Sequence, residues 1–259
     1  MTPPLRPELL ADVRPAFWHR IDVVDETGST NADLAARAAA GEDIARTVLA
    51  AEHQTAGRGR HGRSWATPKG SQLAMSVGVP TDSVPADQWG WLPLLTGVAV
   101  AEAVRELTGV AARLKWPNDV MVGEQKLAGI LAEVAGPVII VGIGLNVALT
   151  ADEAPVPTAT SLAMLGYPGI DRNLLAADIL GRLAEGIEAW RVGAGEAVAA
   201  DYRRLSVTLG RQVRVQLPGD REITGMAIDI DANGGLIIDD GTSRQTVAAG
   251  DIVHLRPPS

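Results

Sequence analysis

The sequence predicts an α+β protein: a mixed, mainly antiparallel sheet with helices packed on it, followed by a small β-barrel. Three strand-like segments between residues 115 and 147 follow one another too closely for crossover helices, so we expect mostly antiparallel pairing. Apolar residues recur at helical spacing from Trp89 to Leu107, which predicts a long core helix. Beyond Ser206 the chain changes to short apolar segments cut by turn signals. We therefore predict two domains, residues 1–206 and 207–259.

The N-terminal part is expected to begin with a strand and a helix. Ile21–Val24 is a short apolar segment typical of a strand. In the helix that follows, Thr30 supplies a cap, Asp33 stands where a capping-box acid would, and Gly41 ends an alanine-rich stretch.

A segment rich in glycine and arginine joins the next two predicted strands. Residues 47–51 predict a buried strand, and residues 72–79 alternate apolar and small side chains until Pro80. The long helix comes next, and Gly109 ends it.

The rest of the chain divides into strands, a loop, two helices and strands again. The strand-like pieces of the first domain are residues 115–122, 127–134 and 138–147. A loop rich in Pro, Ala and Thr and two helices follow, at residues 150–171, 174–190 and 196–205. In the second domain we expect strands at residues 213–217, 236–238 and 252–255, with turns at 218–220 and 233–235.

Composition narrows the class of protein. The 259 residues carry a net charge of −8, which opposes non-specific attraction to nucleic acid or anionic lipid. The absence of cysteine excludes a disulfide framework and thiolate metal sites. No apolar run approaches the ~18 residues of a membrane span, and residues 1–6 show no secretory signal. We expect a cytoplasmic protein without a membrane partner.

The basic segment Gly57–Arg63 matches the dinucleotide fingerprint G-x-G-x-x-G, but its context does not fit. Pro68 and Gly70 stand where the first turns of the phosphate-binding helix should be. A P-loop is excluded too, because no Gly-Lys-Ser or Gly-Lys-Thr follows. Glycine backbone and arginine forks suit phosphate and carboxylate oxygens. A ligand-binding loop, a solvated basic loop and an RNA-binding turn stay open on this segment alone.

Five blocks of sequence together resemble the biotin–protein ligase family in order and spacing. They are Ser29–Asn31, Glu52–Trp65, Lys115–Asp119, Lys126–Leu131 and Gly142–Asn146. The resemblance covers about residues 20–256 and implies a catalytic domain like the class II aminoacyl-tRNA synthetase core, followed by an SH3-like barrel. Only about twenty residues precede the first block, so we expect no helix-turn-helix, no repressor role and no nucleic-acid partner.

The resemblance implies a reaction in two steps. Biotin and ATP would give biotinyl-5′-AMP and pyrophosphate, with Mg²⁺ as the accompanying ion. A lysine of the biotin carboxyl carrier domain of an acyl-CoA or pyruvate carboxylase would then take the biotin. A monomer or weak homodimer is expected. Such chemistry depends on positioning and on cations that stabilise negative charge.

The same resemblance carries the site over residue by residue. The catalytic residues would be Lys126, Arg58 and Asp119, of which Asp119 is also a possible Mg²⁺ ligand. Biotin would be bound by Ser29, Thr30, Asn31, Gln54, Gly57, Arg58, Gly59, Arg60, Lys126, Gly129, Gly142 and Gly144. ATP and the adenylate would be bound by Arg60, Arg63, Trp65, Lys115, Asn118, Asp119, Lys126 and Asn146. The four histidines show no metal-ligand spacing and receive no role.

Two other functions are kept as alternatives. A lipoate ligase or octanoyltransferase shares the fold of the resembled family but lacks the Gly-Arg-Gly-Arg loop. A nucleic-acid-binding module would use the same arginines without any adenylate chemistry.

Overall fold

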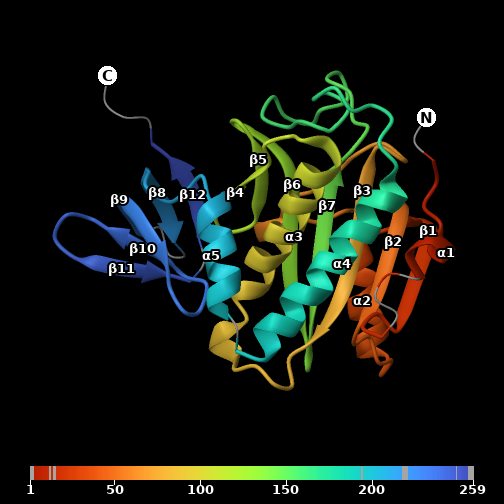
Figure 1. The fold of residues 1–259 in the computed structure, drawn as a ribbon, viewed down its shortest axis with the longest axis horizontal. Coiled ribbons are helices and arrows are strands. Elements are labelled where there is room, and N and C mark those ends of the chain that lie inside the picture. The colour runs from red at the N-terminus through yellow and green to blue at the C-terminus, as the bar shows by residue number, and fades with distance from the viewer. Residues whose placement is uncertain are drawn as a thin grey trace.

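The computed structural model places a seven-stranded sheet at the centre of the protein (Figure 1). It describes residues 3–11, 13, 16–193, 195–217, 221–248 and 250–255. The strand order is β1-β2-β3-β7-β6-β5-β4, in which β1 and β2 are parallel and all other neighbours antiparallel. The strands are β1 Arg20–Thr27, β2 Thr47–Gln54, β3 Gln72–Pro80, β4 Arg113–Lys115, β5 Asp119–Val122, β6 Gln125–Ala135 and β7 Val138–Asn146. The predicted mixed, mainly antiparallel sheet is confirmed.

Helices cover both faces of this sheet. They are α1 Pro7–Ala11, α2 Thr30–Ala39, α3 Trp91–Thr108, α4 Arg172–Arg191 and α5 Gly195–Leu205, with 3₁₀ turns at Arg60–Gly62 and Ala86–Gln88. Along β7, Val138 and Ile140 pack with Leu34 of α2, whereas Ile139 and Val141 belong to the large core formed with α3 and α4. Because strand side chains alternate, α2 lies on one face and α3 and α4 on the other. Within the described ranges, no helix combines the length and hydropathy needed to cross a membrane.

The start of α2 differs by one residue from the sequence prediction. Ser29 is the N-cap, with extended backbone (φ −161°, ψ 131°), and its hydroxyl oxygen accepts from the backbone N–H of Ala32. Thr30 is the first helical residue, and its hydroxyl contacts the side chain of Gln54 and, among the described residues, caps no backbone N–H. Asp33 accepts from the hydroxyl of Thr27, so it does not form a capping box.

Three further elements depart from the expected pattern. Residues 115–122 form the end of β4, a turn and β5, and not one strand-like piece. The short helix α1 and the strands β9 and β11 were not predicted. Their segments carry mixed polar and apolar residues, so tertiary pairing and not local periodicity decides their structure. The predicted turn at 218–220 lies outside the described residues.

The C-terminal part is a five-stranded antiparallel sheet in the order β11-β10-β9-β8-β12. Its strands are β8 Gln212–Leu217, β9 Arg221–Ile230, β10 Leu236–Asp239, β11 Arg244–Val247 and β12 Asp251–His254. Val213, Val215 and Leu236 belong to the same apolar core as α3 and α4. The division at residue 206 stays a prediction, since the core continues across it.

Two tryptophans fasten the C-terminal sheet to the first part of the chain. The indole of Trp116, only 1% exposed, donates to the carbonyl of Gly234 (3.1 Å), and its backbone N–H donates to the hydroxyl of Thr208 (3.0 Å). The indole of Trp91 donates to the carbonyl of Ala232 (2.8 Å). These contacts hold the turn between β9 and β10, and Thr208 ahead of β8, against the first part of the chain, and Figure 1 shows β12 next to β4. Both sheets can therefore line one pocket.

Candidate functional site

A pocket of about 630 Å³ lies above β5, β6 and β7, between the segment Gly57–Arg63 and the C-terminal sheet. Of the site residues predicted from the sequence, all except Gly57 line it. Gly57 lies directly behind the wall: its carbonyl accepts from the backbone N–H of Trp65 (2.8 Å), and a Cβ would stand 2.3 Å from the carbonyl oxygen of Trp65. The five sequence blocks, far apart in the chain, thus meet at one place.

One end of the pocket is built from neutral polar side chains. The side-chain oxygen Oε1 of Gln54 accepts from the backbone N–H of Thr30 (2.9 Å). The same oxygen lies 3.1 Å from the hydroxyl of Thr30. That hydroxyl is 2.6 Å from the hydroxyl of Ser76, which donates to Oδ1 of Asn31 (2.6 Å). All four side chains are at most 9% exposed. Such a cluster matches an uncharged polar ligand group better than a phosphate.

The position of Asn31 explains why residue 142 is glycine. Ser76 pairs with Gly142, and Gly142 with Leu131, in one row across β3, β7 and β6. The Asn31 amide lies over this row, with Nδ2 donating to the carbonyl of Leu131 (3.2 Å) and Oδ1 on Ser76. A Cβ on residue 142 would stand 2.3 Å from Oδ1 of Asn31. Glycine is the residue that leaves this space.

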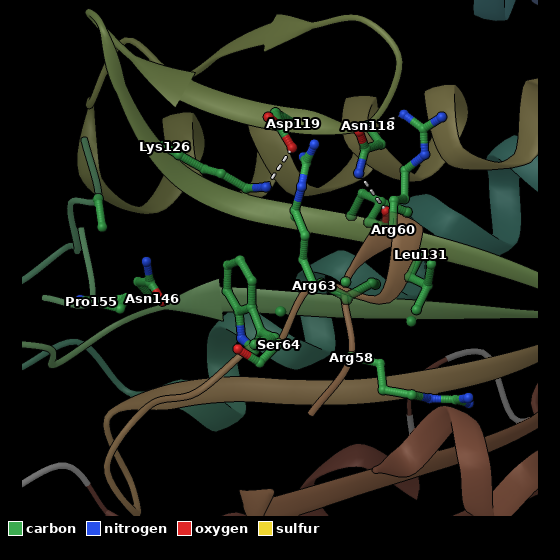
Figure 2. Close-up of a pocket in the computed structure, with 18 of the residues that line it drawn as sticks. Arg58, Arg60, Arg63, Ser64, Asn118, Asp119, Lys126, Leu131, Asn146 and Pro155 are labelled. Atoms are coloured by element: carbon green, nitrogen blue, oxygen red, sulfur yellow. Dashed lines mark hydrogen bonds and ion pairs between the residues drawn. The ribbon is translucent and has the colours of Figure 1, made fainter. Parts of the chain in front are cut away.

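A β-bulge places the predicted catalytic lysine. Lys126 Nζ lies 2.6 Å from Oδ1 of Asp119, and Figure 2 shows the two side chains facing each other. The register of β5 and β6 shifts so that Met121 pairs with Lys126, leaving Leu127 as an extra residue. Lys126 therefore points to the same face as Met121 and Asp119. In a regular ladder Lys126 would pair with Val122 and point to the other face.

Trp65 forms the floor between the polar end and the lysine. Its indole N–H donates to the side chain of Gln72 (2.7 Å), and Nζ of Lys126 lies 5.4 Å from the ring centroid. The ring rests on glycine backbone: a Cβ on Gly144 would stand 2.6 Å from the indole, and one on Gly129 would stand 3.3 Å from it. An apolar surface thus connects the neutral cluster to the charged pair.

The arginines of the loop point to three different partners. Nη2 of Arg58 lies 3.2 Å from the carboxylate of Glu133, and Figure 2 shows Arg58 directed away from Lys126. Arg60 donates to the carbonyl oxygen of the Asn118 side chain and to the carbonyl of Gly250 (both 3.3 Å). Burial, aided by nearby Arg63, lowers the pKa of the Arg60 guanidinium. Such a desolvated cation interacts strongly with an anion that enters the pocket.

The hairpin Gly59–Arg63 is fastened to the C-terminal sheet. The backbone N–H of Gly59 donates to the carbonyl of Arg63 (2.7 Å). The guanidinium of Arg63 pairs with the carboxylate of Asp251, which begins β12, and His61 Nε2 lies 3.5 Å from the same carboxylate. The C-terminal sheet thereby holds the loop over the pocket.

Two asparagines predicted to contact the adenylate, Asn118 and Asn146, use their side-chain N–H groups in hydrogen bonds within the protein. The amide of Asn118 donates to the carbonyl of Ile130 (2.9 Å), which fixes the turn after β4 on β6. The amide of Asn146, 3% exposed, donates to the carbonyl of Thr160 (2.9 Å). Its Oδ1 has no hydrogen-bond partner among the described residues. Asp119 is the first residue of β5.

Sequence reasoning missed several residues of the site. They are Ser76, Glu133, the pocket-lining residues Pro155, Val156, Thr158 and Ala159, and from the C-terminal sheet Gln216, Asp251, Ile252 and Val253. A hydroxyl inside a buried strand could have pointed to Ser76. Glu133 stands on β6 and reaches the site through its contacts with Asn31 and Arg58. The residues of the loop after β7 and of the C-terminal sheet carry no local signal, because only the packing of these segments brings them to the pocket.

The chain is similar to known ligases over most of its length. Residues 27–148 match the model of the biotin/lipoate A/B protein ligase family, and residues 208–255 match that of the biotin protein ligase C-terminal domain. The biotin--[acetyl-CoA-carboxylase] ligase of Mycobacterium tuberculosis is 52% identical over 92% of this chain and 90% of its own. The chain belongs to the biotin protein ligase family. Escherichia coli BirA, a bifunctional ligase/repressor of this family, is 34% identical over 85% of this chain and 69% of its own.

Solved structures of the biotin protein ligase family agree with the fold. The Aquifex aeolicus enzyme in complex with biotin and ATP has a TM-score of 0.80 and 28% identity, covering 92% of this chain and 99% of its own. The Leishmania major enzyme in complex with biotinyl-5-AMP has a TM-score of 0.61 and 27% identity, covering 92% and 99%. The predicted fold class, with a C-terminal sheet of the SH3-like kind, is confirmed.

The described residues of this biotin protein ligase family member form no preassembled metal site. Among the described residues, no group of three or more His, Asp or Glu side chains is arranged to hold a metal ion. Asp119 supplies a single carboxylate beside the pocket. One carboxylate suits Mg²⁺ when substrate phosphates provide further ligands.

Proposed function

We propose that the protein is an ATP-dependent biotin–protein ligase, which makes biotinyl-5′-AMP and transfers biotin to a lysine of a carrier domain. The observation that carries this proposal is the order of groups along one pocket. Neutral polar side chains lie at one end, Trp65 forms the floor, and Lys126 with Asp119 stands beside the loop arginines. This order fits a ligand with an uncharged polar head at the neutral end, an apolar chain over Trp65 and a carboxylate beside Lys126.

In the first step a biotin carboxylate oxygen attacks the α-phosphorus of ATP. The bond from that phosphorus to the oxygen bridging to the β-phosphate breaks, and pyrophosphate leaves with the electron pair. Two anions must approach each other, so the barrier falls when cations are already in place. We assign this role to Lys126, whose compact ammonium can lie between the carboxylate and the α-phosphate. Arg58 of the loop would add its charge after turning from Glu133 toward the phosphate.

The second step consumes the mixed anhydride. A neutral lysine amine of the carrier attacks the biotinyl carbonyl, an amide forms, and AMP leaves with the electrons of the broken acyl C–O bond. The amine must lose a proton, and we assign Asp119, which lines the pocket, to accept it or to direct it to solvent. Lys126 would again stabilise the negative charge, here on the departing phosphate.

The remaining assignments follow the two ends of the pocket. We propose that biotin contacts Ser29, Thr30, Asn31, Gln54, Gly57, Arg58, Gly59, Arg60, Lys126, Gly129, Gly142 and Gly144. We propose that ATP and the adenylate contact Arg60, Arg63, Trp65, Lys115, Asn118, Asp119, Lys126 and Asn146. The glycines would let backbone lie against the ligand, and the arginines would meet phosphate oxygens.

Mg²⁺ is the expected companion of ATP. Asp119 is the residue that would hold it, together with phosphate oxygens, and the ion would neutralise phosphate charge during attack. Arg60 and Arg63 offer further positive charge from the protein itself.

We also propose which carrier domain the enzyme modifies, where in the cell it acts and in which oligomeric state. The name of the Mycobacterium tuberculosis relative specifies acetyl-CoA carboxylase, so the carrier domain of an acyl-CoA carboxylase is the first substrate to test, with pyruvate carboxylase second. The sequence without cysteine supports our expectation of a cytoplasmic enzyme. We expect a monomer or weak homodimer that needs no nucleic acid.

Isotope exchange tests the proposed function. Labelled pyrophosphate should enter ATP only when biotin is present, and a carrier domain should become reactive to streptavidin on a blot. Exchange that requires lipoate instead would favour the related lipoate ligase, and octanoyl transfer without any exchange would favour the octanoyltransferase. Salt-dependent nucleic-acid binding that Arg58→Ala and Arg60→Ala abolish, with no biotin-dependent exchange, would overturn the ligase assignment.

A further inference from the structure

Glu133 lies at the edge of the pocket's polar end and contacts two site residues at once. Its carboxylate oxygen Oε2 accepts from Nδ2 of Asn31 at 2.7 Å and from Nη2 of Arg58 at 3.2 Å. The side chain is 34% exposed and stands on β6, two residues after Leu131. It does not line the pocket, so a direct contact with ligand is not required of it.

The Glu133 carboxylate and the Leu131 carbonyl together determine which way the Asn31 amide faces, and the carboxylate makes the shorter, charged contact. A carboxylate can only accept hydrogen bonds, so the donor group Nδ2 must point to Glu133 and Oδ1 must point to Ser76. The carbonyl of Leu131 also accepts from Nδ2, but at a longer 3.2 Å and without a charge.

This orientation propagates through hydroxyl groups that each have one hydrogen to give. Ser76 must donate to Oδ1 of Asn31, so in its 2.6 Å contact with Thr30 it can only accept. Thr30 then donates to Ser76 and presents lone pairs on its other side. The side-chain oxygen of Gln54 accepts from the backbone N–H of Thr30, whichever way the hydroxyl of Thr30 points.

Without the negative charge the chain could run in the opposite direction. The Asn31 amide could turn over, Ser76 would donate to Thr30, and Thr30 would donate to Gln54, 3.1 Å away. The polar end would then show a different pattern of donors and acceptors to a ligand.

We propose that Glu133 is a positioning residue for biotin: it fixes the direction of the hydrogen-bond chain Thr30–Ser76–Asn31 and ties Arg58 of the loop to that chain. The chain so directed offers acceptor oxygens to the ring N–H groups of a cyclic urea. This inference rests on the proposed function, because it assigns the neutral end of the pocket to the ureido head.

The test compares Glu133→Gln with Glu222→Gln in biotin-dependent pyrophosphate exchange. Glu222 is a matched control, an exposed strand carboxylate 3.9 Å from Arg214 on the C-terminal sheet. We expect Glu133→Gln to raise KM for biotin about tenfold or more, as loss of a charged hydrogen bond does, with KM for ATP unchanged. Thermal unfolding should stay close to that of the control, which separates positioning from a loss of fold.

Ser76→Ala tests whether the effect travels through the chain. If it does, the double variant Glu133→Gln/Ser76→Ala should have a biotin KM no higher than the worse single variant. Multiplicative effects would overturn transmission through Ser76, and a biotin KM within twofold of the control would overturn the inference alone. A wild-type protein that forms no biotinyl-adenylate would overturn the proposed function and the inference with it.

Discussion

At the scale of single residues, the proposed catalytic group is one lysine, Lys126, which a bulge turns toward the pocket. Lys126→Ala removes the ammonium 2.6 Å from Asp119 and leaves no cation at that position. We expect adenylate formation to fall by about 10²–10³-fold, as when one preorganised group at a developing charge is removed, while the protein still folds. Pyrophosphate exchange and circular dichroism would measure both properties.

Lys69→Ala is the control for this substitution. Lys69 is an exposed lysine paired with Asp25 at 2.6 Å, so its loss should leave exchange near the wild-type rate. Near-normal turnover in Lys126→Ala would refute the catalytic role. If the lysine were only structural, its loss would lower the free energy of unfolding and leave turnover per folded molecule unchanged.

Gly142 is the second residue whose substitution separates binding from chemistry. In Gly142→Ala the added methyl group would lie 2.3 Å from Oδ1 of Asn31, so the amide must leave its place on Ser76 and Leu131. We expect KM for biotin to rise about tenfold through lost hydrogen bonds, with KM for ATP unchanged. Gly169→Ala, which has no atom within 4 Å of the added group, is the control. Equal rises in both KM values would show general damage to the pocket.

At the scale of secondary-structure elements, a buried arginine holds the two strands that flank the loop. Arg172, at the start of α4 and 1% exposed, donates to the carboxylate of Glu52 near the end of β2 (2.7 Å). It also donates to the carbonyl of Gln72 at the start of β3 (3.0 Å). Gln72 in turn holds Trp65. One side chain thus connects both ends of the loop.

Arg172→Met should therefore destabilise the protein strongly. Glu52 would stay largely buried without its cation, which typically costs about 3–5 kcal/mol in the free energy of unfolding. Arg182→Met, on the same helix, removes a half-exposed pair with Asp178 and should cost about 1 kcal/mol or less. Urea unfolding measures both values, and equal costs would contradict a special role for the buried pair.

At the scale of the whole molecule, much of the fold could be predicted from local sequence. The helix Trp91–Thr108 follows from apolar spacing and from Gly109, which takes the left-handed conformation (φ 71°). The parallel pairing of β1 with β2 was not predicted, although the helix α2 between the two strands is the crossover connection that a parallel pair needs.

The candidate site was predictable where residues stand in compact blocks. Lys126 and Asp119 could be predicted as site residues from the sequence blocks in which they stand. Their contact depends on the bulge at Leu127 between β5 and β6, which the sequence does not reveal. Asp251 could not be named either. It reaches the loop through the packing of the C-terminal sheet on the rest of the protein, to which Trp116 and Trp91 contribute.

The attachment of the C-terminal sheet should respond to pH through His254. The Thr208 hydroxyl accepts from the backbone N–H of Trp116 and lies 3.1 Å from Nε2 of His254, to which it donates when that nitrogen carries no proton. Burial, with Lys115 and Arg211 nearby, lowers the pKa of His254 from 6.5 to about 4. Protonation would remove the acceptor at the junction of the two sheets.

The sign of the resulting pH dependence follows from linkage. Between the unfolded pKa of 6.5 and the folded pKa of about 4, the unfolded chain binds more protons at His254, so stability falls as the pH falls through this range. Urea unfolding of the wild type and of His254→Gln, at about pH 7 and about pH 5, measures the effect. Glutamine keeps an acceptor for Thr208 but cannot titrate, so the variant should lose about 1 kcal/mol less than the wild type between these values. Equal losses would mean that His254 titrates normally and that other groups carry the pH dependence.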